Sequence, residues 1–252
     1  GFDNTDIAAA GYEPFAHRRF LVEYFTGNFS GSPARGQPFG RNEKTGDVRI
    51  SGSMASLVGL ETALESGDAH QEQRSIELIL LLHSLIMSFG GIPLIYYGDE
   101  LGIVNDYRYL ENPSRARDNR WMHRPTYDWG KVERRRQRGS VEQRIFEGIQ
   151  RLIGVRKTIP AFADFNNREL IDVGNEHLFV FIRNNPSAPD ESVLVVANFD
   201  GNPQQLNLAD LGNRGRFTLG PLKDAASGES PSRFKEQLVI PPQHFYWLVA
   251  SP

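Results

Sequence analysis

The stretch that decides the fold reads Gly90-Gly91-Ile92-Pro93-Leu94-Ile95-Tyr96-Tyr97-Gly98-Asp99-Glu100. Its middle is a nearly continuous apolar run bounded by glycines, which is typical of a strand buried on both faces of a parallel sheet. Residues 69–88, directly before it, place apolar side chains at helical spacing and end at the glycine pair. A helix followed by a turn and a buried strand is half of a β/α unit.

The segments on either side of this unit are long and polar. Residues 1–66 contain no long periodic run, although helices are expected over 15–25 and 54–64. Residues 101–140 form a second polar stretch, which leads into a helix expected over 141–158. Loops longer than about 15 residues are uncommon in compact proteins and are usually functional. Two such loops, each leading into a helix, are typical of the last part of a (β/α) barrel, whose active site is built from the loops that follow its strands.

Beyond Phe162 the apolar pattern changes to that of short strands. Strands are expected over 178–183, 192–199, 216–219, 238–240 and 245–249, with turn clusters between them. This series predicts an antiparallel β-sandwich. The sequence therefore predicts an α/β protein that comprises the C-terminal part of a TIM (β/α)8 barrel with a loop subdomain, followed by an antiparallel β-sandwich domain. The expected regions are a loop subdomain at 1–66, the last barrel helices and strand at 67–162, and the β-sandwich at 163–252.

The composition of the 252 residues excludes several classes of function. Lys and Arg number 28 and Asp and Glu 31, and the resulting net charge of −3 disfavours nucleic acid as a partner. The apolar runs are too short for a membrane span. The absence of cysteine excludes disulfides, Cys-ligated metals and a cysteine nucleophile. Because the six histidines lack zinc spacing and no Gly-rich phosphate loop is present, we expect no metal and no cofactor. From the net charge and the short apolar runs, we expect no nucleic-acid partner and no membrane partner.

Two polar clusters are candidates for chemistry, and each has a structural alternative. Asp99 and Glu100 end the expected strand, where the catalytic groups of a barrel lie, but such residues also cap strands and order the following loop, and we favour the cap. The run Asp118-Asn119-Arg120-Trp121 combines groups that recognise sugars, because an Arg fork can hold two adjacent hydroxyls and a ring can stack on an aromatic face. The alternative for this run is a surface salt-bridge cluster.

Other arginines are also candidates for ligand binding. Arg18 and Arg19 lie side by side on an expected helix and point to different faces, so at most one of them is expected to be functional. Arg49 follows the turn at Gly46, and a solvated side chain is the alternative for each of these arginines. The basic run at 134–136 is interpreted as a solvated face near a helix start, because no aromatic residues are interleaved with it.

Several of these stretches together resemble one enzyme family. The strand motif from Gly90 to Gly102 resembles the eighth barrel strand of the α-amylase superfamily of glycoside hydrolases. Further motifs narrow the resemblance to the amylosucrase group: Asn105-Asp106-Tyr107, Asp118-Asn119-Arg120-Trp121-Met122-His123-Arg124-Pro125, His17-Arg18-Arg19-Phe20, Ala34-Arg35-Gly36-Gln37-Pro38-Phe39 and Thr45-Gly46-Asp47-Val48-Arg49-Ile50-Ser51-Gly52. The similarity runs from Gly1 to the C-terminus, and the ensemble is specific to amylosucrases and the similar sucrose hydrolases.

The resemblance implies an enzyme that cleaves sucrose, transfers the glucosyl unit to an α-1,4-glucan and releases fructose by a retaining double displacement. It implies no cofactor and no catalytic metal, and it makes residues 1–66 the loop subdomain after the seventh barrel strand. In this family the nucleophile and the acid/base follow the fourth and fifth strands, and a His-Asp-Asp group follows the seventh. All of these would lie upstream of Gly1, so we assign no catalytic residue here and expect the chain to pack against an N-terminal portion of the same enzyme.

Three arginines match binding residues of the family. Arg120 matches an arginine that pairs with a carboxylate at the floor of the glucose pocket. Arg18 matches one that lines the acceptor or fructosyl side. Arg49 matches one that closes a salt bridge across the pocket, with an Asp that would lie just before Gly1. The implied partners are sucrose and an α-glucan or maltooligosaccharide.

Two other functions stay open. A sucrose hydrolase has the same scaffold and gives the glucosyl unit to water, although Arg18 and Arg49, which shape the acceptor side, favour transfer. Alternatively, the chain is a non-catalytic saccharide-binding fragment, because it lacks the catalytic carboxylates. We expect a cytoplasmic location, with export as the alternative.

Overall fold

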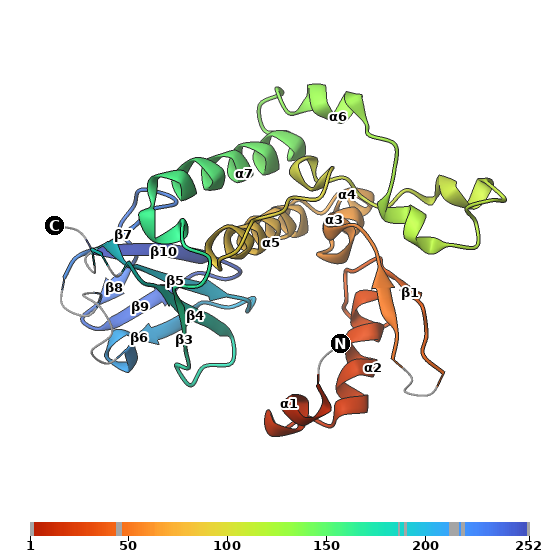
Figure 1. Ribbon diagram of the computed structural model, residues 1–252. Coiled ribbons are helices and arrows are strands. Elements are labelled where there is room, and N and C mark those ends of the chain that lie inside the picture. Colours follow the sequence, from red (N-terminus) through yellow and green to blue (C-terminus); the bar gives the residue numbers. More distant parts are fainter. Residues whose placement is uncertain are drawn as a thin grey trace. The chain divides into compact units, whose positions relative to one another are not determined.

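The chain folds as two units that alternate along the sequence (Figure 1). Unit 1 comprises Gly1–Ile76 and Tyr97–Glu142, and unit 2 comprises Glu77–Tyr96 and Gln143–Pro252. The computed structural model describes residues 3–43, 47–185, 187–188, 191–211, 217 and 220–250. The three regions expected from the sequence, with boundaries at 66 and 162, stay predictions.

Unit 1 is built from short elements joined by long loops. Its helices are α1 (Asn4–Ala9), α2 (Pro14–Phe25), α3 (Met54–Leu57), α4 (Leu60–Ser66) and α6 (Trp129–Arg134), and its strands are β1 (Gln37–Phe39) and β2 (Arg49–Ser51). The 3-10 helices are η1 (Asp99–Leu101), η2 (Tyr107–Glu111) and η3 (Asn119–His123). The helix expected over 15–25 is confirmed as α2, where the Glu13 carboxylate accepts hydrogen bonds from the first-turn amides.

The helix expected over 54–64 is divided into α3 and α4 at Gly59. This residue has a φ of +96°, a conformation that glycine adopts at little steric cost. A Cβ atom at this position would also lie 2.7 Å from the Cβ of Pro33. A side chain here would therefore meet both backbone strain and a steric clash, which explains why the chain turns at this point.

The long helix α5 (Ala69–Ser88) runs from unit 1 into unit 2, which also contains most of α7 (Val141–Thr158) and the 3-10 helix η4 (Pro160–Phe162). Both long helices match the ranges expected from the apolar periodicity. α7 passes close to α5 at Gly148, where an added Cβ would lie 2.5 Å from a methyl carbon of Leu80. Among the described residues, no helix is both long and apolar enough to span a bilayer.

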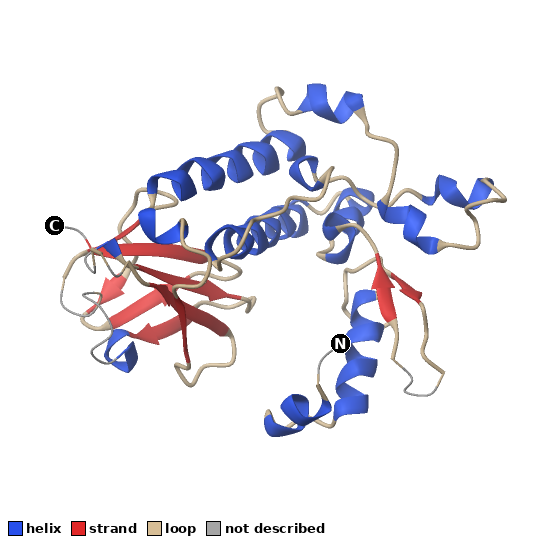
Figure 2. Ribbon diagram, viewed as in Figure 1, coloured by secondary structure: helices blue, strands red, loops and turns tan. Residues whose placement is uncertain are grey.

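Two antiparallel sheets form the rest of unit 2 (Figure 2). One has the strand order β3-β4-β5-β10-β7 and the other β6-β9-β8. Their bounds are β3 (Arg168–Ile171), β4 (Leu178–Arg183), β5 (Val193–Asn198), β6 (Gln204–Asn207), β7 (Leu222–Asp224), β8 (Arg233–Phe234), β9 (Gln237–Ile240) and β10 (Phe245–Ala250), with the 3-10 helix η6 (Leu208–Leu211) after β6. The antiparallel β-domain predicted from the sequence is confirmed, although most of the strand expected at 216–219 lies outside the described residues.

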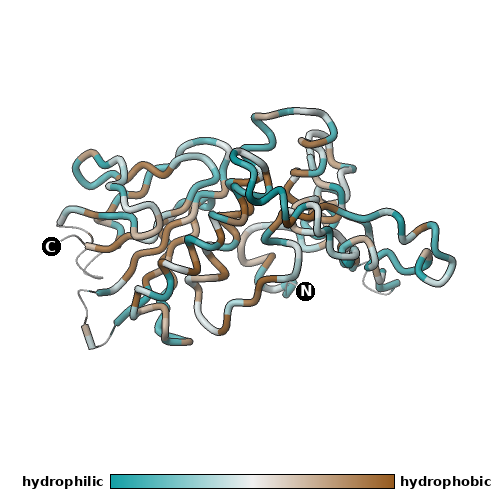
Figure 3. Tube along the Cα trace, turned by 90° about the horizontal axis from the view of Figure 1, so that it is seen from above, coloured by the Kyte–Doolittle hydropathy of each residue, from teal (hydrophilic) through white to brown (hydrophobic). Residues whose placement is uncertain are grey.

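The five-stranded sheet is covered on both faces. On β5, Leu194 and Val196 belong to a core shared with the smaller sheet, while Val193 and Val195 belong to a second core shared with Leu152 of α7. Successive side chains of a strand point to opposite faces, so a strand between two cores needs an uninterrupted apolar run. Figure 3 shows brown, hydrophobic stretches of the chain separated by teal, hydrophilic ones.

The buried strand expected at residues 92–97 is not formed, and this prediction is wrong for the described structure. The segment pairs with no strand among the described residues, and Ile92 and Leu94 are 81% and 79% exposed. Ile95 packs against the second core of unit 2. A strand needs a neighbour that accepts and donates its backbone hydrogen bonds, and local apolarity cannot supply one. The described residues accordingly form no barrel.

Candidate functional site

A two-stranded ribbon in unit 1 organises the candidate site. β1 and β2 pair antiparallel, with Phe39 opposite Arg49 and Gln37 opposite Ser51. Ile50 and Ser51 of β2 contact different parts of unit 1. The Ser51 hydroxyl donates to Asn119 Oδ1 of η3 over 3.1 Å, whereas Ile50 helps to line a pocket beside α2. The ribbon therefore connects η3 to α2.

This pocket has a volume of about 510 Å³ and includes two of the three arginines singled out from the sequence, Arg18 and Arg49. Its apolar wall comes largely from α2, and its lining residues are Arg18, Leu21, Val22, Phe25, Gly40, Asn42, Asp47, Val48, Arg49 and Ile50. Two guanidinium groups beside an apolar wall can bind hydroxyl or anionic groups of a ligand.

Arg18 is held in this pocket by an ion pair. Its Nε lies 3.3 Å from Oδ1 of Asp47, and its side chain is 20% exposed. The neighbouring Arg19 is exposed and does not line the pocket, so only one of the two adjacent arginines faces the site, as their helical spacing predicts. Arg49, by contrast, forms no ion pair with any residue that the structure describes.

Arg120 does not line this pocket and contacts the ribbon through Phe39, whose ring centroid lies 4.6 Å from its guanidinium carbon. A two-pronged contact joins Arg120 to Asp118, with Nε to Oδ1 at 2.8 Å and Nη2 to Oδ2 at 2.7 Å. The hydrogen bonds from Arg120 are the main reason that the pKa of Asp118 falls to about 2. Asn119 fastens η3 to β1 by donating to the carbonyl of Pro38 over 2.7 Å.

Asn105 fixes the loops around the ribbon, a role that its place in the sequence does not indicate. Asn105 is buried, accepts from the Ser53 amide over 2.8 Å and donates to the Arg35 carbonyl over 2.7 Å. Its own amide donates to the Ser56 hydroxyl over 2.8 Å. Asn105 appears in a quoted motif, but only the tertiary structure shows which backbone groups it satisfies.

Glu100 fits the capping interpretation, whereas no backbone amide among the described residues donates to the Asp99 carboxylate. Glu100 accepts the Gly98 amide over 2.8 Å and the Tyr127 hydroxyl over 2.5 Å, which fixes the turn after residue 97. Asp99 is partly buried, and this burial, together with the nearby charge of Glu100, raises the pKa of Asp99 to about 6.

The basic run at 134–136 also has structural partners. Arg134 Nε lies 2.9 Å from Glu142 Oε1, and Arg136 contacts Glu133 at 2.8 Å. Arg136 and Glu133 are exposed, which fits the solvated face expected from the sequence, whereas Glu142 is buried. In the part of the chain that the structure describes, no group of three or more His, Asp or Glu side chains is arranged to hold a metal ion.

No protein-family model matches the chain. Glucosylglycerate phosphorylase of Escherichia coli (strain K12) is 28% identical over 153 residues, which are 60% of this chain and 26% of that protein. The chain thus spans about a quarter of the length of this curated relative.

Solved structures extend the comparison at the level of the fold. AmyP in complex with maltose has a TM-score of 0.53 and 16% identity, over 69% of this chain and 35% of that one. Eubacterium rectale Amy13B has a TM-score of 0.50 and 15% identity, over 80% of this chain and 37% of that one. These likenesses show that the chain shares the fold of a part of each of these two proteins.

Proposed function

We propose that the chain is part of an enzyme that transfers the glucosyl unit of sucrose to an α-1,4-glucan and releases fructose, as amylosucrases do. The observation that carries the proposal is that Arg18 and Arg49 line one pocket. The ribbon that bears Arg49 also contacts Arg120 through Phe39. The same three arginines match the binding residues of the amylosucrase group. The fold likeness to α-amylase-family enzymes supports the same assignment.

In this proposal the N-terminal portion of the enzyme supplies the nucleophile and the acid/base, and the arginines bind and orient the sugars. The nucleophile forms a glucosyl-enzyme while the acid protonates the departing fructose oxygen. A glucan hydroxyl then competes with water for the anomeric carbon. A guanidinium fork that binds acceptor hydroxyls favours the glucan, because a positioned nucleophile reacts far faster than a free one.

A second candidate is phosphorolysis, in which phosphate takes the place of the glucan hydroxyl and glucose 1-phosphate is formed. The 28% identity to glucosylglycerate phosphorylase favours it, and a phosphate could bind the guanidinium groups of Arg18 and Arg49, which line one pocket. Glucosylglycerate is then an alternative glucosyl donor to sucrose.

The test is a product analysis with the full-length protein. It is incubated with sucrose alone, with sucrose and maltooligosaccharide, and with sucrose or glucosylglycerate in phosphate buffer. Fructose release with growth of the oligosaccharide supports the proposal. Glucose 1-phosphate as the main product establishes the phosphorylase instead, and free glucose as the main product establishes a hydrolase. If sucrose releases no fructose under any condition, the proposal is wrong.

A further inference from the structure

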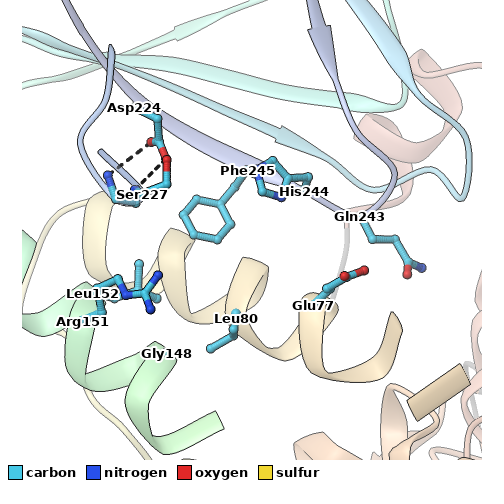
Figure 4. Close-up of a pocket in the computed structure, with 11 residues that line it drawn as sticks. Glu77, Leu80, Gly148, Arg151, Leu152, Asp224, Ser227, Gln243, His244 and Phe245 are labelled. Carbon is cyan, nitrogen blue, oxygen red and sulfur yellow. Dashed lines mark hydrogen bonds between the residues drawn. The ribbon is translucent and has the colours of Figure 1, made fainter. Parts of the chain in front are cut away.

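Unit 2 contains a second pocket, which the proposed function does not use. It has a volume of about 230 Å³ and lies between α5, α7 and the turns that precede β10 and follow β7 (Figure 4). Its lining residues are Glu77, Leu80, Gly148, Arg151, Leu152, Asp224, Ala226, Ser227, Gln243, His244 and Phe245.

The pocket has an apolar middle and polar ends. The Phe245 ring points from the start of β10 toward the two helices, where Leu80 and Leu152 contribute apolar surface. Glu77 and Gln243 lie at one end and Arg151 at the other (Figure 4). A pyranose has the same division, because its C–H face is apolar and its hydroxyls point outward around the ring.

The turn that bears Gln243 is fixed in an uncommon conformation. Gln243 has a φ of +48°, which few residues other than glycine adopt, and its amide donates to the Asp200 carbonyl over 2.9 Å. Buried Asn198 holds the same turn by donating to the carbonyls of Ile240 and Pro241. Backbone strain of this kind persists where the surroundings enforce it and is frequent at ligand sites.

The opposite rim is fixed as well. The buried Asp224 carboxylate accepts from the amides of Ala226, Ser227 and Trp247, at 3.3, 2.9 and 2.8 Å. The pocket therefore exists before any ligand arrives, so binding does not have to order these turns.

The charges around the pocket select among ligand classes. Arg151 is cationic, Glu77 and Asp224 are anionic, and burial lowers the pKa of His244, so its ring is neutral at pH 7. Two carboxylates repel a phosphate or another anion, while the guanidinium of Arg151 repels a cation. A neutral polyhydroxylated ligand avoids both penalties, and its hydroxyls can hydrogen-bond to the polar groups at the two ends of the pocket.

We propose that this pocket binds one neutral pyranose ring, either a free hexose or the end of a glucan chain, with the ring face on Phe245 and hydroxyls at Arg151, Glu77 and Gln243. The pocket is smaller than the roughly 300–1,000 Å³ of common ligand sites, which suits one ring rather than an extended chain. The proposal does not depend on the activity assigned to the pocket of Arg18 and Arg49.

Hydrogen exchange read by mass spectrometry tests this proposal on the full-length protein, with glucose and maltose as separate probes. We expect slower exchange in peptides that cover 241–247 and 147–153. Protection by both sugars identifies a free hexose as sufficient, and protection by maltose alone identifies a chain end. If neither sugar protects these peptides, the proposal is overturned.

Variants show whether the protection comes from this pocket. Arg151 is exposed, so Arg151→Ala should fold normally and weaken sugar binding about tenfold, whereas Gln150→Ala on the same helix should leave it unchanged. Phe245→Ala should weaken it at least as much. Arg18→Ala, in the other unit, should leave protection at 241–247 intact. Unchanged binding in both Arg151→Ala and Phe245→Ala would overturn the proposal.

Discussion

The two units of this chain are stabilised by different interactions. In unit 2, a five-stranded sheet has an apolar core on each face, and β5 is buried along its whole length. In unit 1, the strands are three residues long, and side chains such as Asn105 and Asn119 connect the loops through hydrogen bonds to the backbone. The arginine pocket therefore lies in the part of the chain with the least regular structure, where a few polar contacts determine its shape.

The strongest test of this difference is the removal of an aromatic side chain from the core of unit 2. Trp247 is fully buried and packs edge-to-face on Phe162, with ring centroids 5.0 Å apart. Trp247→Ala should destabilise unit 2 by about 3–5 kcal/mol, because it leaves a large cavity. Denaturant unfolding measures the effect, and Phe234→Ala, at a ring that is 73% exposed, is the control. Equal effects of the two substitutions would refute the assignment of this core.

The next test concerns Arg120, which has a near-duplicate in the same unit. Arg108 contacts both oxygens of Asp106 at 2.7 and 2.8 Å, as Arg120 contacts Asp118, but Arg108 contacts no ring of the ribbon. Arg120→Ala should lower kcat/KM for sucrose about 100-fold, because a small misplacement of the glucosyl group has an effect of this size. Arg108→Ala should stay within a few-fold of the parent. If Arg120→Ala also does, Arg120 is only a surface charge.

The removal of a buried polar side chain should destabilise unit 1, as the removal of a buried apolar side chain destabilises unit 2. Asn105→Ala removes partners of the Ser53 amide and the Arg35 carbonyl, and it should destabilise unit 1 by about 2 kcal/mol. Hydrogen exchange should accelerate near residues 35 and 53 while the strands of unit 2 keep their protection. Asn112→Ala, at an exposed loop, is the matched control. Uniform acceleration in both units would contradict the separate stabilisation inferred here.

Arg18 and Arg49 should control the fate of the glucosyl unit more than its formation. Either change to Ala should raise the ratio of free glucose to oligosaccharide about tenfold at equal sucrose conversion, because an acceptor hydroxyl loses its hydrogen bonds. Arg19→Ala, at the exposed neighbouring position, should leave the ratio unchanged. An unaltered ratio in both pocket variants would remove these arginines from the acceptor site.

The smallest effect concerns the pH dependence of unit 1. Burial raises the pKa of Asp99 to about 6 from the ordinary value of 3.8, so the folded state binds the proton more tightly than the unfolded chain. Stability should therefore fall as the pH rises from about 4 to about 6, by about 1–2 kcal/mol because the carboxyl is only partly buried. Asp99→Asn should flatten this slope in denaturant unfolding at several pH values. An unchanged slope would show that Asp99 titrates normally.

Much of the local structure follows from the sequence alone. The periodicity of residues 69–88 and 141–158 predicts both long helices, because helical spacing of apolar residues is a local property. The alternation and turn signals after residue 162 likewise predict β4, β5, β9 and β10, whereas the shorter strands β3, β6, β7 and β8 are not expected from the sequence. Helical spacing also predicts that Arg18 and Arg19 point to different faces, but not which of them faces a pocket.

The tertiary structure decides what local patterns leave open. Residues 92–96 and 193–198 are both nearly continuous apolar runs, yet only the second forms a strand, because β4 and β10 lie beside it and satisfy its backbone hydrogen bonds. The pairing of β1 with β2 brings Arg49 opposite Phe39, on which Arg120 packs, although the sequence separates Arg49 and Arg120 by a long segment. Residue type and spacing thus determine helices, turns and candidate side chains. Partners for backbone groups and for charges come from distant segments, and only the folded chain brings them together.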